Sequence, residues 1–256
     1  YWVAPPWFYR PSGDVLERLE WLTDVLPSFN GGEQRRELRI APRRSFEFDF
    51  VLTEAERRTA ENRLTQGQSR IWSVPVWMDS QALPVALGPS EVEIPIDTAT
   101  RDFRVGGLVG LMTTPSRFEI LQIKALTDSL VTLESPLTKA WPAGETTVFP
   151  IRHCRMPDRL NLRRFSGDTS YGRLRFECAD PCDWPEASES TYRGLPVLGQ
   201  APNWTEDPDQ GYERMLELLD GGTGLVYSDD QASGPIMVQS HRWMLDGRAQ
   251  IDAFRR

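Results

Sequence analysis

The stretch from Trp21 to Phe50 constrains the fold more than any other part of the chain. Its second half alternates apolar and acidic residues: Phe46, Phe48 and Phe50 with Glu47 and Asp49 between them. Alternation with a period of two is typical of a half-buried strand, so we expect a strand over Ser45–Val51 with its phenylalanines toward the core. The turn signal Asn30-Gly31-Gly32 lies earlier in the stretch and predicts a β-hairpin.

The predicted hairpin carries five arginines, which are Arg35, Arg36, Arg39, Arg43 and Arg44. These side chains could bind phosphate, carboxylates or a neighbouring subunit. The alternative is a solvated strand face whose arginines form ion pairs with acidic residues of the same stretch. Arginine greatly outnumbers lysine in the whole chain, and its planar side chain suits bidentate pairing at interfaces better than lysine does.

Composition narrows the choice between these partners. The 256-residue chain can form one large domain or two smaller ones, and its net charge is −8. An acidic chain argues against a dedicated nucleic-acid-binding protein. The 9 Trp residues and the many arginines fit a protein that binds neighbours, although a well-packed β core also explains the tryptophans. No run of about 18 apolar residues and no signal peptide is present, so we expect no membrane insertion.

Secondary-structure signals elsewhere are mostly those of short strands. Val15–Leu26 is ambiguous, and its pattern alone slightly favours a helix. A capping box at Thr53 predicts a helix that ends near Gly67. Between Glu91 and Pro150, short strands alternate with Gly and Pro turns, which is typical of a small sandwich or barrel. Asp246-Gly247 predicts a hairpin-type turn.

These patterns predict a mainly β fold with β-sandwich or barrel elements and one or two short helices. We expect residues 1–90 to form an N-terminal β-hairpin and helix domain, the first part of a ring-forming β domain. Residues 91–156 are expected to form a small β-barrel or sandwich insert, and residues 157–256 a β-rich second half. The chain starts at Tyr1 and stops at Arg256 inside what looks like a regular element. We therefore expect a fragment of a longer chain that is truncated at its C-terminus.

Candidate catalytic and metal-binding residues are few. The chain has two histidines, and His153 lies beside Cys154 in a strand-like segment. The other two cysteines are Cys178 and Cys182, so the total number is odd. An odd number favours folding in a reducing cytoplasm. These cysteines with His153 could in principle hold zinc, but their spacing is not that of a zinc knuckle. We therefore predict no catalytic, cofactor-binding or metal site.

Three segments resemble a known family: Leu19–Leu26, Asn30–Arg36 and Pro42–Phe46. They are similar to the opening of tail-tip structural proteins of long-tailed (siphovirus-type) phages, of the distal-tail or minor-tail family. In that family a T-D-V segment, a short turn, a G-x-E-Q-R motif and an aromatic strand follow one another. The motif corresponds here to Gly31–Arg35. Weaker similarity extends over most of the chain, to Trp243–Phe254. The resemblance implies an extended hairpin, which would make Val15–Leu26 extended rather than helical.

The resemblance also implies a function. We expect a non-enzymatic structural component of a virion, assembled in the host cytoplasm, that forms a homo-oligomeric ring (a hexamer or trimer) between the tail tube and the tail hub or tip proteins. DNA would pass through its lumen without specific binding. The alternative is a carbohydrate-binding or glycan-hydrolysing module at the tip, where tryptophans stack on sugars. Candidate inter-subunit interface residues are Glu33, Gln34, Arg35, Arg36, Arg39, Arg43, Arg44, Trp2 and Trp7.

Overall fold

The computed structural model describes residues 5–28, 32–182, 191–205, 207, 209–214, 216–230 and 234–255. The fold is mainly β with two short α-helices over these residues, which confirms the predicted fold class. The chain divides into two compact units. Unit 1 is Tyr1–Glu20 with Ala41–Asp183, and unit 2 is Trp21–Ile40 with Trp184–Arg256. Each unit is described by itself.

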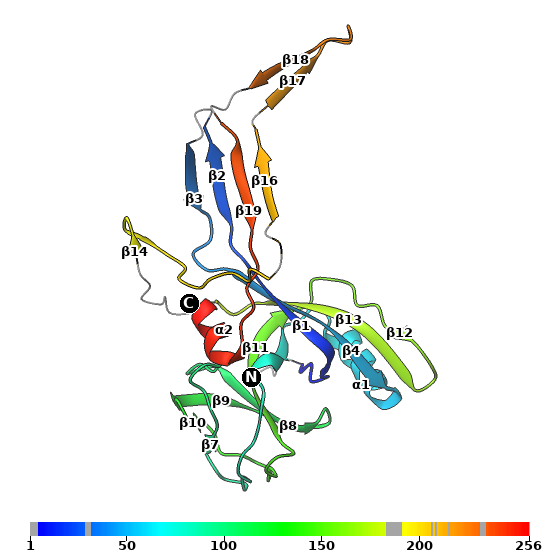
Figure 1. Cartoon of the computed structure of the whole chain (residues 1–256). Coiled ribbons are helices and arrows are strands. Elements are labelled where there is room, and N and C mark those ends of the chain that lie inside the picture. The colour runs from blue at the N-terminus through cyan, green and yellow to red at the C-terminus, as the bar shows by residue number, and fades with distance from the viewer. Residues whose placement is uncertain are drawn as a thin grey trace. The chain divides into compact units, whose positions relative to one another are not determined.

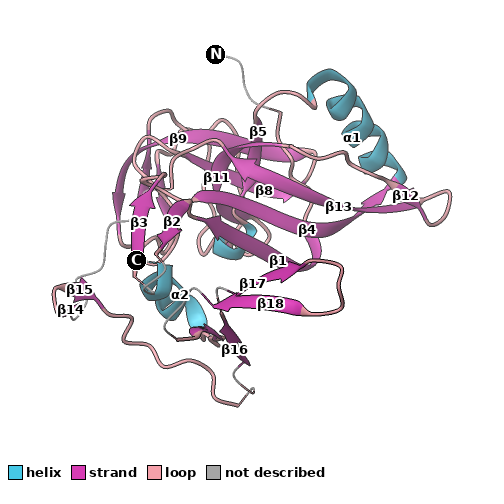
Figure 2. Cartoon of the chain, turned by 90° about the horizontal axis from the view of Figure 1, so that it is seen from above, coloured by secondary structure: helices cyan, strands magenta, loops and turns pink. Residues whose placement is uncertain are grey.

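The main sheet of unit 1 is antiparallel, and its strands follow the order β1-β4-β13-β11-β8-β9-β10-β7. Their bounds are β1 (Pro11–Glu20), β4 (Arg43–Thr53), β13 (Thr169–Cys178), β11 (Thr147–Arg155), β8 (Leu108–Thr114), β9 (Arg117–Thr127), β10 (Leu130–Leu133) and β7 (Glu93–Pro95). Short strands join at its sides: β12 (Arg163–Arg164) pairs with β13, while β5 (Trp72–Pro75) and β6 (Gln81–Ala82) pair with β11. Strand β4 lies between β1 and β13 (Figure 2).

Unit 1 contains two clusters of buried apolar side chains. The first surrounds Trp7, whose ring makes edge-to-face contacts with Phe50 at 5.2 Å and with Trp72 at 5.9 Å between centroids. The phenylalanine face of β4 belongs to this cluster, so the alternation predicted its burial correctly. The second cluster includes Trp141, whose indole Nε1 donates to Glu119 Oε2 at 3.1 Å. Burying side chains of this size contributes about 1.5–3 kcal/mol each.

The first helix, α1 (Glu54–Gly67), begins at the predicted capping box. Thr53 Oγ1 accepts the backbone N–H of Glu56 at 3.4 Å, and Glu56 Oε2 accepts the backbone N–H of Thr53 at 2.9 Å. This reciprocal pair satisfies N–H groups that a helix leaves unpaired at its start. A short 3₁₀ helix, η1 (Trp77–Asp79), follows β5. Both lie in unit 1 and connect strands of the main sheet.

Unit 2 consists of two-stranded pairs and one helix among its described residues. The pairs are β2 (Thr23–Pro27) with β3 (Glu33–Glu37), β14 (Thr191–Tyr192) with β15 (Leu195–Pro196), β16 (Asp209–Glu213) with β19 (Ile236–Ser240), and β17 (Leu216–Asp220) with β18 (Val226–Asp230) (Figure 1). The helix is α2 (Gly247–Arg255). The predicted turn at Asp246-Gly247 was wrong, because Gln250 Oε1 accepts the backbone N–H of Asp246 at 2.7 Å and closes the first turn of this helix.

The stretch from Val15 to Leu26 is extended, so the slight preference for a helix was wrong. Strand β1 pairs antiparallel with β4 in unit 1, and β2 pairs antiparallel with β3 in unit 2. The antiparallel pairing of β2 with β3, on either side of the predicted turn, confirms the predicted hairpin. Cross-strand pairing therefore overrides the local helical pattern. Asn30 and Gly31 of the predicted turn lie outside the described residues.

The predicted parts 1–90, 91–156 and 157–256 do not coincide with the two units. Strand β13 pairs with β4 along Thr169–Glu177, so this part of the chain belongs with unit 1. The range 91–156 supplies most of the second core cluster, but its strands β8 and β11 belong to the main sheet. An unbroken antiparallel ladder therefore joins segments that composition alone would separate.

Candidate functional site

The tip of the hairpin, which includes β3, lies on the surface. Every residue of β3 is exposed. Arg35 Nη2 lies 2.7 Å from Glu33 Oε2, because residues two apart on a strand face the same side. Arg36 is opposite Asp24 in the register but has no ion-pair partner within the described part of the chain. The tip thus offers at least one arginine to a partner.

The predicted interface set divides by burial. Glu33, Gln34, Arg35, Arg36 and Arg43 are exposed, and Arg39 is half-buried. Trp2 lies outside the described residues. Trp7 and Arg44, which are 0% and 2% exposed, lie inside unit 1, so their assignment to an interface was wrong. Trp7 packs in the first core cluster, and Arg44 turns from the start of β4 toward the carboxylates of Glu17 and Asp102.

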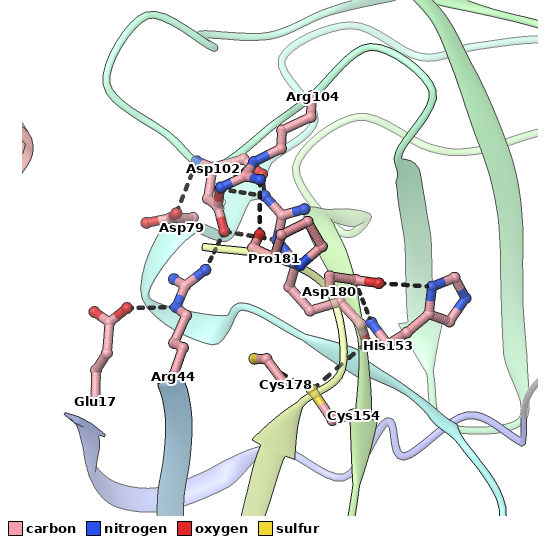
Figure 3. Close-up of polar contacts among 11 residues, drawn as sticks. Glu17, Arg44, Asp79, Asp102, Arg104, His153, Cys154, Cys178, Asp180 and Pro181 are labelled. Atoms are coloured by element: carbon pink, nitrogen blue, oxygen red, sulfur yellow. Dashed lines mark hydrogen bonds and ion pairs between the residues drawn. The ribbon is translucent and has the colours of Figure 1, made fainter. Parts of the chain in front are cut away.

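Arg44 belongs to a buried cluster of charges in unit 1 (Figure 3). Its Nε donates to Glu17 Oε1 at 2.6 Å, and its Nη1 donates to Asp102 Oδ2. Arg152 Nε donates to the same Asp102 oxygen at 2.8 Å. The backbone N–H of Asp102 donates to Asp79 Oδ2 at 2.9 Å. The Asp102 carboxylate therefore connects β4 and β11, and Glu17 adds β1 through Arg44.

Asp102 is the centre of this cluster. Burial alone would raise its pKa, but hydrogen bonds from Arg152 and the charges of Arg44 and Arg152 lower the pKa to about 2. Burial would likewise lower the pKa of Arg44, whereas Asp102 and Glu17 raise it. Asp102 and Arg44 therefore both stay ionised at neutral pH. Because each charge faces opposite charges, the cluster has a structural role in positioning the base of the hairpin.

A second polar group borders a cavity of about 500 Å³ in unit 1. His153 Nδ1 lies 3.4 Å from Asp180 Oδ1, and the backbone N–H of His153 donates to Asp180 Oδ2 at 2.8 Å. The hydrogen bond to Asp180 raises the pKa of His153. Asp180 is the one acidic residue among the described residues that line this cavity. The cavity therefore lacks the pair of carboxylates that glycoside hydrolysis uses.

A smaller cavity of about 310 Å³ lies in unit 2. Its lining includes Trp204, which is 66% exposed, together with Asp207, Asp209, His241 and Arg242. The Trp204 and His241 rings are 6.1 Å apart and meet edge to face. An exposed indole beside carboxylates is a combination that binds sugar rings and their hydroxyl groups.

Strands of unit 2 carry many exposed apolar side chains. Large apolar side chains of β16, β17, β18 and β19 are exposed: Tyr212, Leu216, Leu218, Leu219, Val226, Tyr227, Met237 and Val238. Leu218 and Leu219 are neighbours on β17, so apolar groups occupy both faces of that pair. No apolar residue among those described in unit 2 is buried. Exposed apolar side chains of this number on the strands of one unit favour contact with a partner.

Sequence reasoning missed two of these features. The Asp102 cluster joins residues 58 and 50 positions apart, and no local pattern signals such pairing. The apolar strands of unit 2 had a signal in Leu216-Glu217-Leu218-Leu219, but it did not distinguish helix from strand. Their exposure followed only from the structure.

Comparison with known proteins leaves the resemblance to phage tail proteins untested. No protein-family model matches the chain, and no curated protein is significantly similar to it. Among the residues that the structure covers, no helix is long and apolar enough to cross a membrane. Within the same residues, no group of three or more His, Cys, Asp or Glu could hold a metal ion.

Proposed function

We propose that this chain is a non-enzymatic structural subunit of a phage tail tip, which self-associates into a ring between the tail tube and the tip. The observation that carries the proposal is unit 2: it has four strand pairs and no buried apolar side chain among its described residues. An isolated two-stranded pair is marginally stable in water. Neighbouring subunits would supply the cover and the pairing partners that these strands lack.

Charge supports a second copy of the chain as the neighbour. Strand β3 presents Arg35 and Arg36, whereas β16 and β18 present the exposed carboxylates of Glu213 and Asp229. In such a contact, β3 of one copy would bind β16 and β18 of the next copy. Each subunit would then use two different surface patches. Such a heterologous contact repeats from copy to copy and closes into a ring when the rotation allows.

The proposal also names the partners, the location and the lumen of the ring. Tail tube and tail hub or tip proteins would bind the faces of the ring, and the virion tail tip would be its location. The net charge of −8 suits a lumen through which DNA passes without being held, since binding to DNA depends on neutralising phosphates. A gel-shift measurement checks this part. Tight, salt-sensitive binding of duplex DNA would contradict it.

The assembly state tests the proposal most simply. Mass photometry of the purified chain over a concentration series is expected to show monomers that convert into one closed species of three or six copies. A chain that remains monomeric under all conditions, including the presence of tail tube protein, would contradict the ring. Association that yields open-ended fibres without a defined size would also contradict it.

The cavity at Trp204 favours a second candidate, a glycan-binding module at the tail tip. Trp204→Ala would then abolish binding to bacterial surface glycans on an array. Trp21→Ala is the matched control, because Trp21 is 60% exposed but lies outside this cavity. Equal binding by the Trp204→Ala variant and the wild type would remove this candidate.

A further inference from the structure

Two of the three cysteines face each other between neighbouring strands of unit 1 (Figure 3). Cys154 on β11 and Cys178 on β13 are register partners, and their Sγ atoms are 3.5 Å apart. Both thiols are free. Directly opposed residues of antiparallel strands have Cα atoms about 4.5–5.5 Å apart. That range lies within the roughly 4.4–6.8 Å that a disulfide spans, so the two strands already hold the spacing of a disulfide.

The pair lies at the narrowest junction of the main sheet. Strand β13 pairs with β11 only at Cys154–Cys178 and Arg155–Glu177, whereas it pairs with β4 along Thr169–Glu177. This junction connects the β1-β4-β13 part of the sheet to the β11-β8-β9-β10-β7 part. A covalent bond here would cross-link two parts of unit 1 that share few backbone hydrogen bonds.

We propose that Cys154 and Cys178 form a modification site, in which a low-molecular-weight disulfide oxidises the pair to a cross-strand disulfide that locks the β11–β13 junction. The site remains reduced while the chain folds among reduced thiols. It closes when the folded protein meets an oxidising medium. The geometry that carries this inference lies within unit 1 and is independent of the assembly proposed above.

Exposure determines the order of the two exchange steps. Cys178 is half-buried, whereas Cys154 and Cys182 are buried. Burial raises the pKa of Cys154 well above its ordinary value, and it raises the pKa of Cys182 to about 11. Both buried thiols are therefore slow to attack a disulfide in solution, whereas Cys154 only has to reach the adjacent Cys178 sulfur. A small disulfide in solution reaches Cys178 first.

The chemistry balances without a metal or cofactor. The Cys178 thiolate attacks one sulfur of the small disulfide, forming a mixed disulfide and releasing one small thiol. Cys154 then loses its proton and attacks Cys178 Sγ, which displaces the second small thiol. Two protein thiols become one disulfide, and one small disulfide is reduced to two thiols.

Cys182 is the competing thiol. It lies four residues after Cys178, nearer in the sequence than Cys154 does. Cys182 is not a register partner of either cysteine, however, and the described strand pairing does not hold it opposite Cys178. The proposal therefore predicts that Cys182 keeps its thiol when the pair is oxidised.

The test uses the full chain, purified under reducing conditions and then exposed to oxidised glutathione. Peptide mapping by mass spectrometry is expected to find Cys154 linked to Cys178 and Cys182 still free. The melting temperature should rise by roughly 5–10 °C on oxidation and fall again after a reductant is added. A link between Cys178 and Cys182, the absence of an intramolecular link, or an unchanged melting temperature would overturn the proposal.

Single variants test which two cysteines form the disulfide. Cys182→Ser keeps the proposed pair and is expected to oxidise and to gain melting temperature as the wild type does. Cys178→Ser is expected to show neither change, while its melting temperature in reductant stays close to that of the reduced wild type. A Cys178→Ser chain that still gains melting temperature on oxidation would overturn the assignment. The wild-type peptide map decides the question even if a variant fails to fold.

Discussion

Unit 1 and unit 2 are both built from antiparallel strands, yet they differ in what holds the strands in place. Unit 1 has a continuous sheet and two clusters of buried side chains, together with a buried charge cluster around Asp102. Unit 2 has separate strand pairs whose apolar side chains are exposed. Hydrophobic burial is the dominant favourable term in folding, so unit 1 has an internal source of stability. The described residues of unit 2 include no buried apolar side chain, and this contrast is the basis of the proposed function.

The largest expected effect is on the core of unit 1. Phe50→Ala removes a fully buried ring that packs on Trp7, and it is expected to lower the free energy of unfolding by about 3–5 kcal/mol. Leu218→Ala is the comparison in unit 2, where the side chain is 61% exposed. This change is expected to leave the unfolding free energy of the monomer within about 0.5 kcal/mol of wild type while weakening assembly.

Chemical denaturation and mass photometry measure the two effects. If Leu218→Ala destabilised the monomer as much as Phe50→Ala does, unit 2 would have a core of its own, and the contrast between the units would fail.

The charge cluster is expected to give an effect of similar size. Asp102→Ala leaves Arg44 and Arg152 buried without their shared carboxylate, and it is expected to destabilise unit 1 by about 3–5 kcal/mol. Asp97→Ala is the control, because Asp97 is an exposed residue whose carboxylate lies 3.5 Å from Arg101. Removing a surface pair of this kind is expected to cost no more than about 1 kcal/mol.

The lowered pKa of Asp102 predicts a loss of stability in acid. The pKa of Asp102 is about 2 in the folded chain, against an ordinary value of 3.8. Because the folded pKa is the lower one, the carboxylate contributes stability fully above pH 3.8, and this contribution is lost as pH falls toward 2. Thermal melts between these values are expected to show a steeper loss for wild type than for Asp102→Ala. Parallel curves for the two proteins would assign the acid transition to other groups.

The arginine tip is expected to affect assembly and not folding. Arg35→Ala combined with Arg36→Ala removes two exposed side chains of β3, so the change in monomer stability should stay within about 0.5 kcal/mol. The fraction of protein in the assembled species should fall sharply in the same sample. Arg163→Ala with Arg164→Ala is the matched control, because these adjacent, exposed arginines lie on β12 of unit 1. Equal loss of assembly in both double variants would mean that net charge, and not the hairpin tip, controls association.

The smallest expected effect concerns His153. Its pKa is raised above 6.5, first through the hydrogen bond to Asp180, so the pair contributes stability below pH 6.5. This contribution is lost as pH rises through the folded pKa. Asp180→Asn is expected to move the pKa of His153 back toward 6.5 in an NMR titration, with little change in melting temperature, because both side chains are partly solvated. An unchanged titration would mean that Asp180 does not hold the imidazolium.

Features set by neighbours in the sequence were predictable. The alternation at Phe46, Phe48 and Phe50 predicted both the strand and its buried face, and Thr53 with Glu56 predicted the start of α1. Features set by distant partners were not predictable. Val15–Leu26 carries a helical pattern, and only its pairing with β3 and β4 decides the extended form.

The candidate site, too, could be predicted only in part, because it depends on distant partners. The sequence placed five arginines on one hairpin, but it could not separate Arg44 from the others. The burial of Arg44 depends on Asp102, which lies 58 residues further along the chain. The exposure of the strand pairs in unit 2 could not be predicted either. Alternation indicates a strand but does not show what covers its apolar face.

Hydrogen–deuterium exchange on the dilute monomer and on the assembled species tests the central claim most directly. In the monomer, backbone amides of β16–β19 and β17–β18 are expected to exchange far faster than those of β4 and β13, because fluctuations open unsupported strand pairs easily. Assembly is expected to slow the exchange of these unit 2 amides and to leave β4 and β13 unchanged. Monomer amides in β16–β19 and β17–β18 that are as protected as those of β4 would show that unit 2 is stable by itself, and they would contradict the account.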